Sequence, residues 1–270
     1  MDLKSRNQVD KMAQQITPIS AAQKLTQDGL FAFNSRTISA LFGLDKFQTL
    51  SLLNRMEQAG LVARIEQGKF LLLGLTPERV LSNPLYIGCN LVTPAYISFW
   101  SALHFHGFTE QAPRTTFVAT TRRKKEITFR EMNYKFVTLR PEALFGYRRE
   151  MLAELPVVVA DEPKSILDSL SLPQYAGGIS EVAKALQIAV SEGSLGTPML
   201  LEYAERLRNG SLRSRLGYLL ELLRQPTSSL QPSKGPVRLD PQNPARGSFN
   251  KRWKLYVNVL LEGLFPQGVA

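Results

Sequence analysis

The sequence predicts an α+β fold in two domains, and three observations support this prediction. Apolar positions at helical spacing fill residues 9–60, two short strand-like stretches follow over 61–73, and strand-like and helical stretches succeed one another after residue 114. A chain of 270 residues is long enough for one or two domains, and 44% hydrophobic residues is ordinary for a folded protein. We therefore expect a helical N-terminal domain with a small hairpin, followed by a mixed α/β domain.

The N-terminal segment carries the start and stop signals of short helices. Residues 9–27 predict a first helix or helix pair that is broken near Pro18, because proline cannot continue a helix interior. Ser35 is the expected N-cap of a second helix over 37–42. These two elements precede the part of the sequence with the clearest pattern.

A tight turn and a capping box follow the second helix. Gly43 supplies the turn, and Asp45 with Gln48 three residues later opens a third helix. Residues 61–65 and 69–73 then read as two strands of a hairpin. Helix-turn-helix spacing followed by a hairpin of this size predicts a winged helix-turn-helix domain over 1–75.

The third helix is expected to have a buried side and an exposed side. The buried side comprises Thr49, Leu52, Leu53 and Met56, and the exposed side comprises Lys46, Phe47, Leu50, Ser51, Asn54 and Arg55. Polar residues of such a helix read base edges, and cations on the hairpin contact phosphates. The candidate DNA-binding residues of this domain are Lys46, Gln48, Ser51, Asn54, Arg55, Arg64 and Lys69.

Phe47 and Leu50 are unusual on a surface that would read DNA. Two interpretations remain open: the side chains contact thymine methyl groups, or they pack on another domain or subunit. The sequence does not decide between them.

Residues 76–94 are expected to form the connector to the second domain, because they contain Pro77, Pro84 and Pro94 and lack a sustained periodicity. The second domain then covers 95–270. We expect Thr93 to cap a helix that begins at Pro94 and ends at Gly107. The apolar residues at helical spacing in this segment are Tyr96, Phe99, Trp100 and Leu103.

Strands are predicted next, over 115–121, 127–129 and 134–139. We expect a hairpin connection between the first two, and it carries four consecutive cations, Arg122, Arg123, Lys124 and Lys125. The segment from Arg114 to Arg149 holds ten basic and three acidic residues. A patch that binds DNA, RNA or an acidic protein is therefore favoured over a solvated turn.

The last part of the chain alternates a strand with helices. Residues 157–160 predict a central strand, and Asp161 is expected to cap the helix that follows it. Further helices are expected over 179–192, from 197 and from 211, before a strand over 253–259. In the helix from 211 we expect Arg213 and Arg215 to face away from the core.

The composition restricts the possible chemistry. Cys89 is the single cysteine, so no internal disulfide or multi-thiolate metal site can form. His104 and His106 lie about 200° apart on a helix and are expected to end it half-buried, not to share a metal ion. Glu162 and Lys164 have the acid-x-Lys spacing of PD-(D/E)xK nucleases, but helix capping explains them better. We expect no metal, no cofactor and no catalytic site.

The charge points to a polyanionic partner. Lys and Arg number 33 against 23 Asp and Glu, a formal net charge of +10, and this field attracts nucleic acid or an acidic protein. No apolar run reaches the roughly 20 residues of a membrane-spanning helix, and the N-terminus lacks the apolar stretch of a signal peptide. We expect a cytoplasmic protein with no membrane partner.

Several motifs, in the same order along nearly the whole chain, resemble those of AbiEi-type antitoxins of type IV toxin-antitoxin systems. The most specific segments are YISFWSALHFHGFTEQ at 96–111 and FVATTRR at 117–123. Further agreement comes from ADEPK at 160–164 with Leu167 and Asp168, from RLGYLL at 215–220, and from Arg252 and Trp253 with Asn258.

The resemblance implies a winged-helix repressor that binds inverted repeats in its own promoter, with a C-terminal α/β domain that antagonises a nucleotidyltransferase-like toxin. A pair of protomers or tandem copies of such a repressor binds the repeated site, and both domains can present a basic face to DNA; the sequence does not reveal the oligomeric state. The residues that match family positions are Lys46, Gln48, Asn54 and Arg55 on the recognition helix, Arg64 and Lys69 on the wing, and Arg122 and Arg123 after the strand. The apolar pair Phe47 and Leu50 departs from the family pattern. Two alternatives remain: a protein-binding regulator with little specific DNA binding, and a nuclease-like enzyme.

Overall fold

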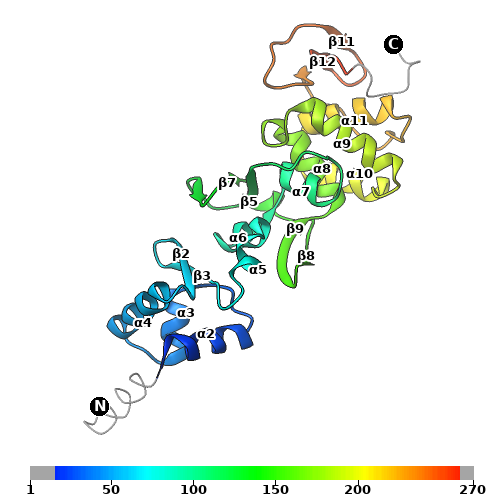
Figure 1. Cartoon of the computed structure of the whole chain (residues 1–270). Helices are drawn as coiled ribbons and strands as arrows, with labels where there is room; N and C mark the ends of the chain where they lie inside the picture. The colour runs from blue at the N-terminus through cyan, green and yellow to red at the C-terminus, as the bar shows by residue number, and fades with distance from the viewer. Residues whose placement is uncertain (1–15, 262–270) are drawn as a thin grey trace. The chain divides into compact units, whose positions relative to one another are not determined.

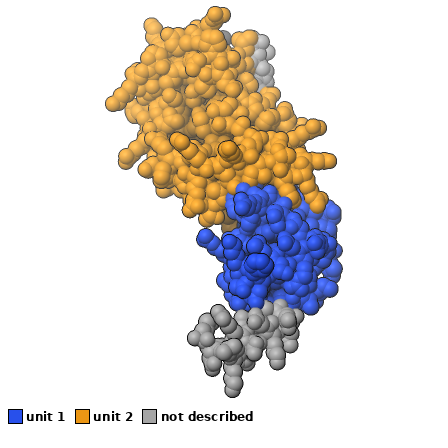
Figure 2. All heavy atoms as spheres, turned by 90° about the vertical axis from the view of Figure 1, so that its left-hand side faces the viewer, with its two compact units in different colours: residues 1–91, 151–155 blue, residues 92–150, 156–270 orange. Residues whose placement is uncertain are grey.

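The computed structural model describes residues 16–261 and divides into two compact units (Figures 1 and 2). The first unit comprises 1–91 with 151–155, and the second comprises 92–150 with 156–270. Both contain helices and strands, so the fold is α+β, as predicted. The part of the expected first helix at 9–15 lies outside the described residues. Among the described residues, no helix is long and apolar enough to cross a membrane.

The first unit packs helices on a three-stranded sheet. Its sheet has the order β1-β3-β2, and both pairings are antiparallel. Buried apolar residues of all these elements form one core, with Leu25, Ile38 and Leu53 fully buried. The elements are α2 (Pro18–Gln27), β1 (Ala32–Asn34), α3 (Ser35–Phe42), α4 (Lys46–Gln58), β2 (Val62–Glu66) and β3 (Lys69–Leu72).

Local capping determines where α3 and α4 begin. Asn34, and not Ser35, caps α3, because the Asn34 side chain accepts a hydrogen bond from the Thr37 amide at 3.0 Å. At α4 the predicted capping box is confirmed: Asp45 accepts from the Gln48 amide at 2.8 Å, and the Gln48 side chain accepts from the Asp45 amide at 3.1 Å. Gly43 lies between the helices in the left-handed conformation, with φ of 63°.

Two short helices occupy the segment where we expected an irregular connector. They are α5 (Pro77–Leu81) and α6 (Pro84–Asn90), and each has a proline in its first turn, where no amide hydrogen is needed. Asn83 caps α6 by accepting from the Tyr86 amide at 3.0 Å. The helices are too short for a periodic pattern to reveal them.

Most of a mixed sheet of six strands, in the order β6-β7-β5-β4-β9-β8, belongs to the second unit; residues 151–155 at the β8–β9 turn are assigned to the first. The expected helix from Pro94 to Gly107 is wrong in its first part: β4 occupies residues 95–97, and only then does α7 begin. Tyr96 pairs with Ala119 and is fully buried, so strand pairing overrides the helical spacing. The bounds are β4 (Ala95–Ile97), α7 (Phe99–Phe105), β5 (Thr115–Thr120), β6 (Ile127–Phe129), β7 (Met132–Thr138), β8 (Tyr147–Leu152) and β9 (Leu155–Ala160).

The basic run at 122–125 is not a hairpin turn. β5 pairs with β7 in parallel, and β6 pairs with β7 antiparallel, so β7 lies between β5 and β6. The connection that carries the four cations therefore crosses from one side of β7 to the other. Sequence spacing could not show this, because the pairing partner of β5 follows β6 in the chain.

Helices complete the second unit (Figure 1). Helix α8 begins at the predicted cap Asp161, and most of its residues are buried against α7, α9, α10 and α11. A small sheet in the order β10-β12-β11 follows the last helix. The bounds are α8 (Glu162–Ser171), α9 (Ile179–Ser191), α10 (Thr197–Arg206), α11 (Gly210–Leu222), β10 (Val237–Arg238), β11 (Ser248–Asn250) and β12 (Leu255–Val257), with 3-10 turns at Pro141–Ala143 and Pro173–Tyr175.

Arg215 does not face away from the core. Its side chain is buried, and its guanidinium donates to the Arg238 carbonyl at 3.0 Å and to the Leu170 carbonyl at 3.2 Å. Burial lowers its pKa to about 10. These carbonyls are 23 and 45 residues away in sequence, so Arg215 links α11 to distant parts of the second unit.

Candidate nucleic-acid interface

Helix α4 presents the expected exposed face. Thr49, Leu52, Leu53 and Met56 are buried, which places the core side of the helix where the sequence predicted it. The six residues expected on the opposite side are all exposed to solvent: Lys46, Phe47, Leu50, Ser51, Asn54 and Arg55.

The candidate residues on α4 differ in how much of their hydrogen-bonding capacity is free. Within the described range, neither Lys46 nor Arg55 forms an ion pair, and Ser51 and Asn54 make no side-chain hydrogen bond. Gln48 is different, because its side chain holds the helix start through the capping box. Four of the five candidates on α4 are thus available to a ligand, and Gln48 serves the helix itself.

The two cations of the β2–β3 hairpin already have partners. Arg64 lies 3.3 Å from Glu57 and stacks over the Phe70 ring at 5.3 Å. Lys69 pairs with Glu66 at 2.8 Å, and its ammonium also donates to the Leu91 carbonyl. The Arg64–Glu57 pair is exposed and therefore weak, so a phosphate is able to compete for it, whereas the Lys69–Glu66 pair is partly buried. The local charge is balanced before any ligand binds.

The exposed apolar pair on α4 is present as expected. The Phe47 side chain is 88% exposed, and Leu50 is 44% exposed. Both lie on the side of the helix that carries Lys46, Asn54 and Arg55. The surface therefore offers apolar and polar groups to the same partner.

The basic run at 122–125 belongs to the second unit, and the α4 candidates belong to the first. Arg122, Arg123 and Lys125 are exposed, whereas Lys124 is partly buried with its ammonium 5.3 Å from the centre of the Phe136 ring. The Arg122 amide donates to Thr120 at 3.2 Å, which fixes the start of the run at the end of β5. The run is a cationic segment anchored to the sheet.

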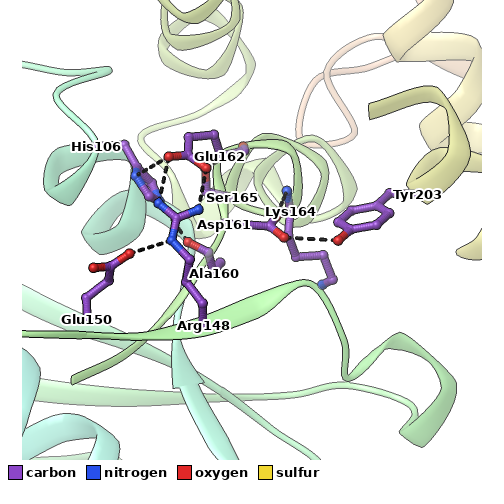
Figure 3. Close-up of polar contacts among 9 residues, drawn as sticks. All are labelled: His106, Arg148, Glu150, Ala160, Asp161, Glu162, Lys164, Ser165 and Tyr203. Atoms are coloured by element: carbon purple, nitrogen blue, oxygen red, sulfur yellow. Dashed lines mark hydrogen bonds and ion pairs between the residues drawn. The ribbon is translucent and has the colours of Figure 1, made fainter. Parts of the chain in front are cut away.

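Sequence reasoning missed a polar network at the start of α8 (Figure 3). Arg148 donates to both oxygens of Glu162, at 2.7 and 2.8 Å, and also to Glu150. These contacts hold the pKa of Glu162 at about 2. His106 bonds to the Ala160 carbonyl through Nε2 at 2.7 Å, and its Nδ1 lies 3.6 Å from Glu162. No short-range sequence signal predicts this network, because its residues lie on β8, on α8 and at the end of α7.

The two residues with nuclease-like spacing point to different partners. Glu162 belongs to the Arg148 network, whereas the Lys164 ammonium is fully buried and donates to the Tyr96 hydroxyl at 2.7 Å and to Asp168. Tyr96 and Ser98 each donate to Asp168 at 2.8 Å. The described part of the chain contains no group of three His, Cys, Asp or Glu residues that is able to hold a metal ion.

Asp161 completes this region. It caps α8 by accepting from the Lys164 amide at 2.9 Å, and it accepts a second hydrogen bond from the Tyr203 hydroxyl at 3.1 Å (Figure 3). Burial raises the pKa of the Asp161 carboxyl despite these two bonds. Each polar group of the region thus has a partner within the protein.

Comparison with known proteins supports the α+β fold. No protein-family model matches the chain, and no curated protein matches it. Among solved structures, the chain is similar to the RV2827C protein from Mycobacterium tuberculosis, with 13% sequence identity and a TM-score of 0.57. The match covers 87% of this chain and 88% of that protein chain. At this identity the similarity concerns the fold alone.

Proposed function

We propose that this protein is a DNA-binding transcriptional repressor that acts on its own promoter and resembles AbiEi-type antitoxins. The observation that carries the proposal is the exposed face of α4. Its residues Lys46, Ser51, Asn54 and Arg55 have no ion pair or side-chain hydrogen bond in the described part of the chain. Polar side chains that stay free on an ordered helix are available for base edges and phosphates.

The order of elements supports a winged helix-turn-helix in the first unit. Helix α3 passes through Gly43 into α4, and the β2–β3 hairpin follows directly. In this interpretation α4 is the recognition helix and the hairpin is the wing. A helix of 13 residues is about 20 Å long, which suits insertion into the major groove.

The residue types on α4 suit direct readout. Asn54 has the donor and acceptor that pair with adenine, and the Arg55 guanidinium matches the two acceptors of guanine. Phe47 and Leu50 provide apolar contacts for thymine methyl groups. Arg64 and Lys69 on the wing then exchange their carboxylate partners for phosphates.

The second unit contributes phosphate contacts in this proposal. The exposed cations Arg122, Arg123 and Lys125 attract the DNA backbone irrespective of sequence. Two protomers bound to an inverted repeat would double both sets of contacts. Affinity then resides partly in the second unit and discrimination resides in α4.

Binding of the full chain to its own upstream DNA and to a scrambled duplex, each over a salt series, tests the proposal. We expect a preference of about 10³ or more for the upstream DNA at physiological salt. Equal and steeply salt-dependent binding to both duplexes would contradict it, because the basic charge would then be a nonspecific footprint.

A second candidate function is a protein-binding regulator that antagonises a nucleotidyltransferase-like toxin. The observation that favours it is the 88% exposure of Phe47 beside Leu50, since exposed apolar side chains mark protein interfaces. Phe47→Ser separates the two functions. Loss of toxin antagonism with unchanged DNA binding would favour the protein-binding regulator, and loss of DNA binding alone would favour the repressor.

A further inference from the structure

A hollow of about 580 Å³ in the second unit is lined by basic side chains. Its cations are Arg140, Arg208, Arg213 and Lys234, which come from three separate parts of the chain, since Arg208 and Arg213 lie on either side of the start of α11. In the described range, Arg213 pairs with Glu205 at 3.3 Å, whereas the other three cations form no ion pair. Like charges repel when they face one space, so this arrangement is suited to a bound anion.

The segment that carries Lys234 is held firmly against α11. The Ser233 amide donates to Ser214 at 2.9 Å, and Arg213 donates through Nε to the Gln231 carbonyl at 2.9 Å. A Cβ atom on Gly210 would lie 3.1 Å from the Ser233 Cα, so glycine permits the close approach of the segment to the helix. The hollow is therefore built into the fold.

The start of α11 adds backbone donors to the same hollow. Asn209 caps the helix by accepting from the Leu212 amide at 3.2 Å. The amides of Gly210 and Ser211 have no hydrogen-bond partner within residues 16–261, and both residues line the hollow. Free amides and the positive end of the helix dipole favour an anion next to the four cations.

Arg208 stands at the edge of the hollow in an unfavourable backbone conformation. Its φ is 50°, a value that residues other than glycine and asparagine rarely adopt. The side chain is exposed, and within the described residues it makes no hydrogen bond or ion pair. The fold thus places an unpaired guanidinium at this position at a conformational cost.

We infer that this hollow binds the phosphate group of a small molecule, either a phosphate monoester or a pyrophosphate. Guanidinium groups bind phosphate oxygens in pairs, and a dianion balances more of the gathered charge than one phosphodiester does. The volume falls within the range of small-molecule sites. The lining residues include no aromatic ring to stack on a base, so recognition depends on the phosphate. The inference goes beyond the proposed function and does not depend on α4.

Calorimetric titration of the full chain with inorganic pyrophosphate, at constant ionic strength, tests the inference. We expect saturable binding to one site with Kd below about 1 mM. Arg208→Asn keeps a residue that tolerates positive φ and removes the charge, so we expect Kd to rise about 10-fold. Lys234→Gln should raise Kd by about the same factor; the Lys234 side chain is exposed and makes no hydrogen bond or ion pair among the described residues.

Arg224→Asn is the matched control, because Arg224 is also exposed, has φ of 56° and lies outside the hollow. This variant should change Kd less than about 2-fold. Absence of saturation, or an equal effect of Arg224→Asn, would overturn the inference.

Binding measurements with a DNA duplex distinguish a small phosphate ligand from the phosphates of the DNA backbone. If pyrophosphate fails to saturate while Arg208→Asn and Lys234→Gln weaken duplex binding and Arg224→Asn does not, the hollow contacts the DNA backbone and the inferred small ligand is wrong. If pyrophosphate binds equally well with and without the duplex, a small-molecule site separate from the DNA contacts is supported.

Discussion

The exposed face of α4 and the polar region at the start of α8 use the same kinds of side chain in opposite ways. On α4, Lys46 and Arg55 are exposed and lack carboxylate partners within the described residues. At the start of α8, Arg148 lies between Glu150 and Glu162, and Lys164 is buried against Asp168. The first region has its polar groups free, and the second has them satisfied.

Whether a polar side chain already has a partner within the protein is our criterion for inferring a ligand from a sequence motif. The acid-x-Lys spacing of Glu162 and Lys164 is explained by two separate ion pairs within the protein. Within residues 16–261, Lys46, Asn54 and Arg55 of α4 have no such internal partners, and neither has Arg208 of the hollow. Charges with partners position and stabilise elements, whereas exposed charges without partners are available for recognition.

The largest expected effect of breaking this pattern is on the stability of the second unit. Lys164→Ala leaves the Asp168 carboxylate buried without its cation, and we expect a loss of about 3–5 kcal/mol in the free energy of unfolding. Both tryptophans, Trp100 and Trp253, belong to the second unit, so urea unfolding followed by tryptophan fluorescence reports on it.

Arg123→Ala is the comparison variant, because Arg123 is exposed in the same unit and has no ion pair among the described residues. It should change the free energy of unfolding by less than about 0.5 kcal/mol. A loss below about 1 kcal/mol for Lys164→Ala would show that the buried pair is not the stabilising feature inferred here.

The second largest effect concerns DNA affinity. Reversing the charges of the run at 122–125 to glutamate should weaken binding to upstream and scrambled DNA alike, by about 100-fold at low salt. The salt dependence should also fall, with a slope lower by about 0.9 for each phosphate contact that is lost. Equal salt slopes before and after the reversal would contradict a role of the run in DNA binding.

Local signals in the sequence predicted the starts of α4 and α8, and long-range pairing explains why β4 was missed. Asp45 with Gln48, and Asp161, could be predicted as caps because their partners lie three residues away. The exposed face of α4 followed from the periodicity of its buried residues. β4 was read as helix because its burial depends on pairing with β5, which no spacing within 95–97 encodes.

The same reasoning applies to the polar residues. The interaction of Tyr96 with Asp168 spans 72 residues, and the burial of Arg215 depends on the carbonyls of Leu170 and Arg238. The helical pattern predicted Arg215 on the solvent side because the residue is charged. The pattern contains no information on the distant backbone carbonyls that accept hydrogen bonds from a buried guanidinium. Networks of this kind become visible only when the tertiary structure is known.

A smaller effect is expected from single changes on α4. Arg55→Ala should lower the discrimination between upstream and scrambled DNA by about 1–3 kcal/mol, because an unpaired guanidinium is lost from the face that we propose to read bases. Lys24→Ala removes a cation of α2 that pairs with Asp28 at 2.8 Å, and it should leave discrimination unchanged. Competition binding with both duplexes measures the two variants. If they lose discrimination equally, a free charge on α4 is no better a guide to recognition than a paired one.

The smallest effect is a pH dependence with opposite signs at two adjacent carboxyl groups. The pKa of Glu162 is lowered from 4.5 to about 2, so its stabilising contribution is present above pH 4.5 and disappears as the pH falls towards 2. The free energy of unfolding of the wild type should therefore exceed that of Glu162→Gln by less than about 1 kcal/mol at neutral pH, because the ion pair is partly exposed. This difference should vanish in acid.

The pKa of Asp161 is raised by burial, so the wild type should gain stability relative to Asp161→Asn as the pH falls. Asparagine retains the helix cap in this variant. Urea unfolding from pH 7 to pH 3 measures both trends. Parallel trends would mean that the Arg148 network does not stabilise the ionised form of Glu162.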